Sequence, residues 1–247
     1  MRVVGASVTG SGHRQRGRGC DDAHHVVAIG DDSGDGVVLA VADGAGSARL
    51  AAVGAETAVV WAAELAAWLI AEAEGAGRAV TWPHLLTDVL HATRGRLQRR
   101  AVAHGARLAD LSTTLSVAVL LPDVLAVAQV GDGAVVVRRA DGVALLDPPG
   151  RSEYLNETCF VTSDGWRDDL RVSVEDAAAV TGIALMTDGL QLLALDLAAG
   201  RPHEPFFTPL WDFAAGDGQA GELESFLASD RVAARTDDDT TLVLAVR

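Results

Sequence analysis

The chain contains no lysine, so all 20 of its basic side chains are arginines, and 34 acidic residues leave a formal net charge of −14. Nucleic acids and anionic membranes bind basic faces, so neither is expected as a partner. Cysteine is also scarce: Cys20 and Cys159 stand far apart and form no Cys-x-x-Cys pair. A structural zinc site is therefore not expected, and a reducing, cytoplasmic environment is the default.

Long uninterrupted apolar segments are also missing. The N-terminal Met-Arg-Val-Val-Gly-Ala-Ser-Val stretch is too short for a secretory signal. Residues 51–73 are mostly Ala, Val, Leu and Trp, but Glu56, Glu64 and Glu72 interrupt them. Because carboxylates are costly at bilayer depth, this segment is predicted to be a buried helix and not a membrane span. Its tryptophans are expected in the core.

The 247 residues show no repeats and no linker, and a single domain over residues 1–247 is expected. Apolar runs bounded by turns predict a hairpin at 26–29 and 37–42, a meander at 112–121, 124–130 and 134–139, and strands at 182–186 and 241–246. Residues 140–180 are irregular. Helices are predicted at 47–74, 82–104 and 190–199, and in two pieces within 202–230. Long helices flanking antiparallel strands indicate an α+β fold.

Three of the apolar runs end directly in Asp-Gly, at Asp43, Asp132 and Asp188, and the acidic run 237–239 precedes the last strand. A carboxylate at a strand end sits on a rigid element. Several of them converging repel one another unless a cation lies between them. The glycine lets the backbone turn sharply beside such an ion. The pattern therefore predicts a carboxylate-built divalent metal centre.

The chemistry of such a centre follows from its ligands. Mg²⁺ and Mn²⁺ prefer oxygen ligands, and two such ions about 4 Å apart can share a water, lower its pKa and clamp a phosphoryl group. The chain has no P-loop, no His-Glu-x-x-His motif and no recognisable Ser or Cys nucleophile elbow. The acidic residues present and the motifs absent therefore favour hydrolysis by metal-activated water.

Six short segments occur in a characteristic order: Cys20-Asp21-Asp22-Ala23, Val41-Ala42-Asp43-Gly44-Ala45-Gly46-Ser47, Ser112-Thr113-Thr114-Leu115, Val130-Gly131-Asp132-Gly133, Met186-Thr187-Asp188-Gly189-Leu190 and Asp238-Asp239-Thr240-Thr241. Together they resemble the metal-dependent protein phosphatases of the PP2C (PPM) family, over about residues 10–246. The resemblance implies a four-layer αββα sandwich of two antiparallel sheets flanked by helices. It also implies hydrolysis of phosphoserine and phosphothreonine in proteins.

The resemblance also implies roles for individual residues. Asp43 matches the carboxylate that bridges two metal ions, and Gly44 matches the residue whose carbonyl binds one of them. Asp188 and Asp238 match the ligands of the other ion. Asp132 matches a ligand that, with Asp188, can hold a weaker third ion. The N-terminal acidic position near the metals, often a ligand through water, falls on Asp22.

The phosphate-binding arginine of the family precedes that acidic position, where Arg14, Arg16 and Arg18 compete, and the spacing favours Arg16 or Arg18. A general-acid histidine that some eukaryotic members carry after the Asp-Gly is replaced by Ala45, as in many bacterial members. Protonation of the leaving group then falls to metal-bound water or to His13.

Two further departures are Asp239, where the family commonly has Asn, and Cys20-Asp21, where it has a polar pair. Residues 150–166 also differ from the usual flap, and we take them as a candidate segment for substrate selection. Together these features resemble a divergent bacterial branch, some members of which accompany kinases. Besides the phosphoprotein substrate, a cognate Ser/Thr kinase is therefore an expected partner.

Other interpretations stay open at this point. The chain could be a catalytically weak regulatory module of the same fold, or an unrelated Asp-rich calcium-binding protein, although no EF-hand spacing is present. Asp164 in Ser-Asp-Gly is read as a plain turn that continues into a hairpin. Asp237 and Asp239 are read as solvated neighbours of Asp238, and His13 as either a loop residue or a catalyst. No metal role is expected for His24-His25.

Overall fold

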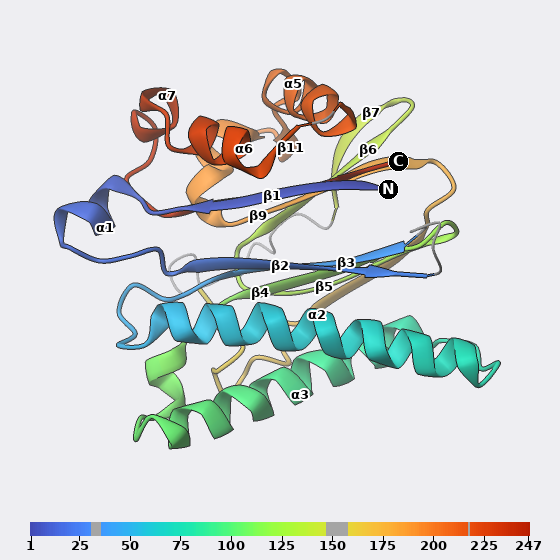
Figure 1. Ribbon diagram of the computed structural model, residues 1–247, viewed down its shortest axis with the longest axis horizontal. Coiled ribbons are helices and arrows are strands. Elements are labelled where there is room, and N and C mark those ends of the chain that lie inside the picture. The colour runs from blue at the N-terminus through green and yellow to red at the C-terminus, as the bar shows by residue number, and fades with distance from the viewer. Residues whose placement is uncertain (31–35, 147–157, 217) are drawn as a thin grey trace.

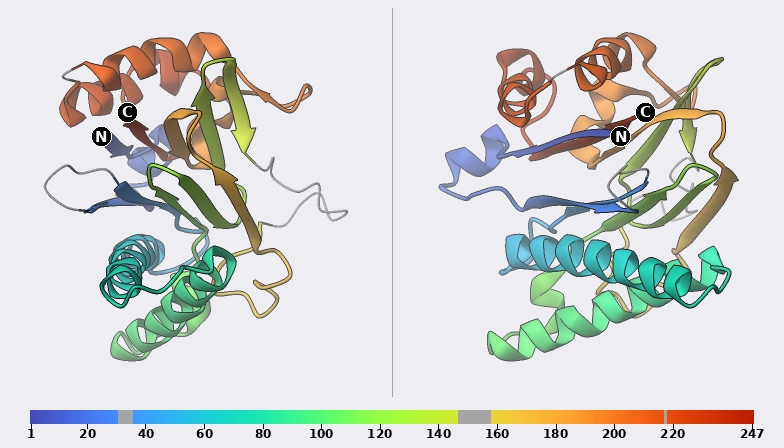
Figure 2. Two further views of the ribbon diagram at one scale, coloured as in Figure 1. Left: turned by 90° about the vertical axis from the view of Figure 1, so that its right-hand side faces the viewer. Right: turned by 45° about the vertical axis from the view of Figure 1, so that its right-hand side comes forward.

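The protein folds into four layers, with two antiparallel sheets between two layers of helices (Figures 1 and 2). The computed structural model describes residues 1–30, 36–146, 158–216 and 218–247. Sheet 1 has the order β1 (Arg2–Val8), β12 (Thr240–Val246), β9 (Val180–Met186), β6 (Ala134–Arg139) and β7 (Gly142–Leu146). Sheet 2 has the order β2 (Asp22–Ile29), β3 (Gly36–Asp43), β4 (Leu115–Leu120), β5 (Val124–Val130) and β8 (Arg171–Asp176). The expected αββα sandwich is confirmed.

The helices cover the outer faces of the sheets. Sheet 2 carries α2 (Ala51–Gly75) and α3 (Trp82–Ala103), and sheet 1 carries α5 (Glu204–Ala215) and α6 (Ala220–Leu227) (Figure 1). Short elements complete the chain: α1 (Ser11–Gln15), η1 (Leu108–Leu111), η2 (Asp188–Leu190), α4 (Gln191–Ala194), β10 (Leu195–Asp196), β11 (Arg201–Pro202) and α7 (Asp230–Ala233).

Strand β3 shows how the period of two in a strand builds the layers. Val37, Leu39 and Val41 face sheet 1 and form part of the core between the sheets. The intervening residues Val38 and Ala40 face α2 and belong to the core beneath the helices. Because side chains alternate, residue 43 points in the same direction as residue 41, toward the space between the sheets.

Helix α2 is long and apolar enough to cross a bilayer by length and composition, and it is the one such helix found among the described residues. Its small residues, such as Ala58, Ala62 and Ala66, are fully buried against sheet 2 and α3. This packing agrees with the predicted buried helix. Trp68, which was expected in the core, is instead 57% exposed.

Three expectations about the secondary structure were wrong. The predicted meander breaks after β5, because β6 crosses into sheet 1 and pairs there with β9 and β7. Strand β8 pairs with β5 and not in a local hairpin, while the residues around Asp164 form turns. The helix predicted at 190–199 ends at Ala194, where β10 begins. Strands β1 and β7 were not predicted.

Candidate metal centre

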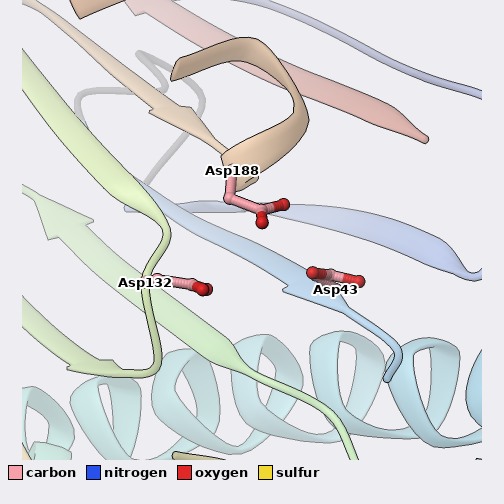
Figure 3. A group of neighbouring side chains, drawn as sticks. All are labelled: Asp43, Asp132 and Asp188. Atoms are coloured by element: carbon pink, nitrogen blue, oxygen red, sulfur yellow. The ribbon is translucent and has the colours of Figure 1, made fainter. Parts of the chain in front are cut away.

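Three carboxylates converge at one end of the sandwich. Asp43 ends β3, Asp132 lies in the turn from β5 to β6, and Asp188 begins η2, separated from the end of β9 by Thr187. Carboxylate oxygens of the three residues lie within 4.8 Å of one another, and Figure 3 shows the side chains pointing toward a common space. The three Asp-Gly sequences therefore meet, as the sequence predicted.

The backbone around Asp43 is held firmly. Its N–H donates to Thr114 Oγ1 at 2.9 Å, and its carbonyl accepts from the Thr114 N–H at 2.8 Å and the Thr113 hydroxyl at 2.9 Å. Neither threonine was singled out from the sequence as a support for this carboxylate. Such fixed positions reduce the entropy lost when a ligand binds.

The glycines after the acidic residues allow close backbone contacts. A Cβ on Gly44 would lie 2.6 Å from the carbonyl oxygen of Ala51, and one on Gly189 would lie 2.0 Å from that of Asp239. The Gly44 N–H donates to the Asp21 carbonyl at 3.1 Å. These glycines therefore pack the turns at the acidic end against neighbouring backbone, where no other residue fits.

Asp22 lies opposite Asp43 in the β2–β3 pair and is buried. Its Oδ2 accepts a hydrogen bond from the Thr187 hydroxyl at 2.8 Å. Asp22 thus lies beside Asp43 but is not one of the three converging carboxylates.

Only one of the two carboxylate oxygens of Asp132 accepts a hydrogen bond from a described residue. Its Oδ2 accepts from the Thr158 hydroxyl at 2.8 Å, whereas Oδ1 is buried and has no hydrogen-bond partner in the part of the chain that the structure describes. A buried carboxylate oxygen without a donor is unfavourable in the absence of a cation. This orphaned oxygen fits a metal ligand.

The electrostatics of the cluster point the same way. Burial, followed by repulsion from neighbouring carboxylates, raises the pKa of Asp43 to about 9, and burial also raises that of Asp22 to about 8. Burial and the charges of Asp132 and Asp238 raise the pKa of Asp188 to about 6. Carboxylates whose charged forms are this unfavourable fit a site that holds a divalent ion, since hard cations prefer such oxygens.

Asp238 and its neighbours differ from one another. Asp238 is exposed and lies near enough to raise the pKa values of Asp43 and Asp188, but it is outside the group of three. Asp237 is exposed, as expected. The interpretation of Asp239 as a solvated neighbour was wrong, because only 2% of this residue is exposed.

Asp239 is buried because three donors surround its carboxylate. It accepts hydrogen bonds from the N–H of Gly10 at 2.6 Å, the N–H of Asp21 at 2.5 Å and His13 Nδ1 at 2.8 Å. Asp239 thus ties residues 10–21 to the start of β12. His13 is itself buried within α1, with its Nδ1 engaged in this contact.

The candidate phosphate-binding arginines occupy different surroundings. Arg18 donates to Asp21 Oδ2 at 2.5 Å and to the Gly46 carbonyl at 2.7 Å, so it lies over the loop that follows Asp43. Arg16 and Arg14 are exposed, and Arg14 donates to the Thr9 carbonyl.

The remaining sequence candidates lie apart from the cluster. Asp164 is exposed in a turn and pairs with Arg94 at 3.0 Å. Half-buried His24 contacts Ser7, and His25 contacts Glu64. Of the candidate segment 150–166, residues 150–157 lie outside the described residues.

Comparisons with known proteins bear on this architecture. The sequence profile described as protein phosphatase 2C matches residues 9–228. Serine/threonine-protein phosphatase 3 of Escherichia coli is 35% identical over 256 residues, covering 99% of this chain and 98% of that protein. A crystal structure of a bacterial serine phosphatase gives a TM-score of 0.66 at 14% identity, covering 100% of this chain and 97% of that one. The catalytic domain of the serine/threonine protein phosphatase PstP, in complex with two manganese ions, gives 0.65 at 16% identity, covering 99% and 97%.

The fold and the acidic cluster together define an αββα sandwich with a carboxylate centre at one end of its sheets. The chain belongs to the protein phosphatase 2C family. The family resemblance seen in the sequence is thereby confirmed, together with the expectation of a protein-serine/threonine phosphatase.

Proposed function

We propose that residues 1–247 act as one catalytic domain that hydrolyses phosphoserine and phosphothreonine in proteins with the help of two Mn²⁺ or Mg²⁺ ions. The observation that carries the proposal is the convergence of Asp43, Asp132 and Asp188, whose oxygens lie within 4.8 Å of one another. The manganese in the PstP catalytic domain supports a divalent metal at this kind of centre.

The proposed ligands follow from the positions of the acidic residues. Asp43 would contribute to holding both ions, the Gly44 carbonyl would bind one of them, and Asp188 and Asp238 would bind the other. Asp132, with its orphaned Oδ1, serves a third and weaker ion together with Asp188. Asp22 orients solvent at the centre from the opposite strand. When bound, the ions supply an activated water and neutralise phosphoryl charge.

The N-terminal segment supplies the contacts to the phosphoryl group in this proposal. Arg18 lies over the loop after Asp43, and exposed Arg16 is the second candidate. An arginine fork matches phosphate oxygens and orients them for in-line attack. His13 is the one histidine offered as a proton donor to the leaving group. Its Nδ1 is engaged with Asp239, and its Nε2, which would carry the proton, lies 3.9 Å from Asp21 Oδ2.

Thr158 supports the hypothesis that residues 150–166 contribute to substrate selection. Its hydroxyl donates to Asp132, which brings the described end of this segment to the acidic cluster. The proposed substrate is a phosphoprotein, and a cognate Ser/Thr kinase is the proposed partner. The E. coli relative carries the name of a serine/threonine-protein phosphatase. The proposed location is cytoplasmic, in line with two free cysteines.

Hydrolysis of p-nitrophenyl phosphate and of phosphoserine, phosphothreonine and phosphotyrosine peptides tests the proposal. We expect turnover that requires Mn²⁺ or Mg²⁺, favours the first two peptides and is lost in Asp43→Asn. Arg18→Ala and Arg16→Ala should raise KM for phosphopeptides, with Arg14→Ala as the matched control. Folded protein that binds metal without turnover would instead favour the catalytically weak binding module.

A further inference from the structure

The second half of α3 and the turn after it carry a concentration of positive charge. Residues 89–109 include five of the 20 arginines and no aspartate or glutamate, in a chain whose formal net charge is −14. All five except Arg94 are exposed. The net charge of the protein therefore repels an acidic molecule, whereas this region attracts one.

A groove of about 410 Å³ lies in this basic region, and we call it the α3 groove. The residues that line it include Arg94, Gly95, Gln98 and Arg99 of α3 and Leu108 of η1. Gly95 and Arg99 are one helical turn apart and share a face of the helix. Arg94 and Gln98 form a second row beside them. The groove thus offers two guanidinium groups and an amide as hydrogen-bond donors, which suits carboxylates.

Gly95 keeps its side of the groove open. Among the described residues, and apart from adjacent backbone, the one heavy atom within 4 Å of a Cβ built at Gly95 is Arg99 Nη1, at 3.7 Å. No close contact therefore requires glycine here, although glycine weakens a helix interior relative to alanine. The Arg99 guanidinium lies over this unfilled part of the helix surface, so a bound segment has room beside it.

The two arginines of the α3 groove differ in their partners. Arg94 donates to the carbonyls of Val161 and Thr162 and pairs with exposed Asp164 at 3.0 Å. An exposed ion pair of this kind is weak. Arg99 is exposed and pairs with no carboxylate in the part of the chain that the structure describes. Its guanidinium can therefore bind a carboxylate of another molecule without breaking an existing ion pair.

The α3 groove and the acidic cluster lie at the same end of the sandwich. In Figure 1, α3 returns toward the end at which α2 begins, after the loop that follows Asp43. The Val161 N–H donates to the Thr113 carbonyl at 3.0 Å, and the Thr113 hydroxyl donates to the Asp43 carbonyl at 2.9 Å. The backbone that Arg94 holds is therefore joined through Thr113 to the backbone of the acidic cluster.

The separation of the two sites suits one extended peptide. Thr158, whose hydroxyl donates to Asp132, and Thr162, whose carbonyl accepts from Arg94, are four positions apart in the chain. Four residues span at most about 14 Å when fully extended. With the reach of side chains at both ends, a peptide bound at the acidic cluster reaches the α3 groove within about four to seven residues.

We propose that the α3 groove binds an acidic segment of the phosphoprotein substrate, about four to seven residues from the phosphorylated side chain. The inference rests on the proposed function, because that function places the phosphorylated side chain at the metal centre. The negative charge of the remaining chain contributes selectivity, since it repels an acidic segment in other orientations. A nucleic acid needs a longer series of phosphate contacts than two arginines supply.

Steady-state kinetics with matched phosphoserine peptides tests the inference. Glutamates are placed about four to seven residues from phosphoserine, on its N-terminal or its C-terminal side, and glutamines take the same positions in the reference peptides. We expect at least one glutamate peptide to have a KM about fivefold below that of its glutamine reference, with kcat unchanged, because one exposed charge pair supplies about this factor.

Arg99→Glu should abolish this KM preference. Arg78→Glu is the matched control, since it makes the same charge change at an exposed position in the turn between α2 and α3, and it should keep the preference. Equal KM values for glutamate and glutamine peptides in the wild type would overturn the inference, and so would an unchanged preference in Arg99→Glu.

Binding in EDTA separates the α3 groove from catalysis. A fluorescein-labelled glutamate peptide without phosphate should bind the full-length wild type by anisotropy, and its affinity should fall with added salt. Gly95→Leu fills the groove and should weaken binding about fivefold or more, as should Arg99→Glu. Gly95→Ala is the matched control, because its Cβ makes only an ordinary contact, and it should retain the affinity. Equal affinities in the wild type and Gly95→Leu would reject the groove.

The two experiments distinguish failure of the inference from failure of the proposed function. Peptide binding that depends on Arg99, without turnover of any phosphopeptide, would contradict the proposed function and retain the groove as a site for acidic segments. Turnover without a contribution from Arg99 to binding or KM would contradict the groove alone. Tighter binding of a single-stranded RNA of equal charge, with the same dependence on Arg99, would overturn the choice of a peptide.

Discussion

Asp22 and Asp43 are direct partners across the β2–β3 pair, so two carboxylates that burial disfavours as anions face each other at the same end of one hairpin. Opposed like charges destabilise a strand pair. In the metal-free protein, protonation of these carboxylates is the least costly way to remove the repulsion between them. Divalent ions at the centre relieve the same repulsion without protonation.

Asp43→Asn is expected to stabilise the metal-free protein while abolishing metal-dependent hydrolysis. The variant removes a buried carboxyl group that must take up a proton on folding at neutral pH, which should raise the free energy of unfolding in EDTA by roughly 1–3 kcal/mol. Urea unfolding followed by circular dichroism measures this difference. Asp164→Asn is the matched control, because Asp164 is an exposed Asp-Gly residue whose surface pair should be worth about 0–1 kcal/mol. A destabilised Asp43→Asn would contradict the expected repulsion.

The stability of the metal-free protein should fall as the pH rises from about 4 to about 9. The folded-state pKa values of Asp188, Asp22 and Asp43 are raised to about 6, 8 and 9, so the folded state holds protons that the unfolded chain releases near 3.8. Stability from protonation is therefore present at low pH and is lost as these groups ionise.

Melting temperatures in EDTA at several pH values between these limits check the expectation. Asp43→Asn should show a shallower decline than the wild type, and Mn²⁺ should flatten the decline in the wild type because metal replaces protons. A wild-type curve that rises with pH in EDTA, or that runs parallel to the variant, would contradict the role of Asp43.

Gly189→Ala should destabilise the fold and lower metal affinity together. The new Cβ would lie 2.0 Å from the Asp239 carbonyl oxygen, so η2 must move away from the start of β12 and carry Asp188 with it. Overpacking of this kind costs about 1–3 kcal/mol. Denaturant unfolding and Mg²⁺ titration measure the two effects.

Gly221→Ala provides the comparison for Gly189→Ala. Gly221 lies in α6 with open space around its Cβ position, so alanine should stabilise that helix by about 0.5–1 kcal/mol. Equal effects of the two variants would show that helix and turn propensities, and not the contact with Asp239, determine the outcome.

Asp239→Ala should lower the free energy of unfolding by roughly 2–5 kcal/mol. It leaves the buried N–H groups of Gly10 and Asp21, and His13 Nδ1, without their acceptor, at about 1–3 kcal/mol for each unsatisfied group. Asp237→Ala, at an exposed neighbour, should change stability by less than about 0.5 kcal/mol. If the two variants prove equally stable, the three contacts to Asp239 contribute little.

The sequence predicted the acidic cluster well because local rules determine it. An apolar run that ends in Asp-Gly identifies a strand end, and the alternation along β3 sends residue 43 into the space between the sheets. The same rules failed for β6. Its Gly131-Asp132-Gly133 connection resembles a hairpin turn, yet Gly131, at φ 106°, lets the chain pass from one sheet to the other.

The features that the sequence did not predict depend on contacts between residues far apart in the chain. The donors that bury Asp239 come from residues 10–21, and nothing near Asp239 in the sequence marks it as different from exposed Asp237. Ser7 and Thr241 are partners across 234 positions of sequence, so no local pattern pairs them. Such contacts depend on strand order, which the sequence alone did not provide for β1.

Residues of the acidic cluster come from both halves of the sandwich: Asp43 ends a strand of sheet 2, Asp188 follows a strand of sheet 1, and Asp132 lies in the crossing between them. Ions held between these carboxylates would therefore also cross-link the chain, closing long loops as a disulfide does. Chelation should loosen the sandwich at this end first. Amide protons at the ends of β3 and β9 should then exchange faster, while the covered faces beneath α2 and α5 stay protected.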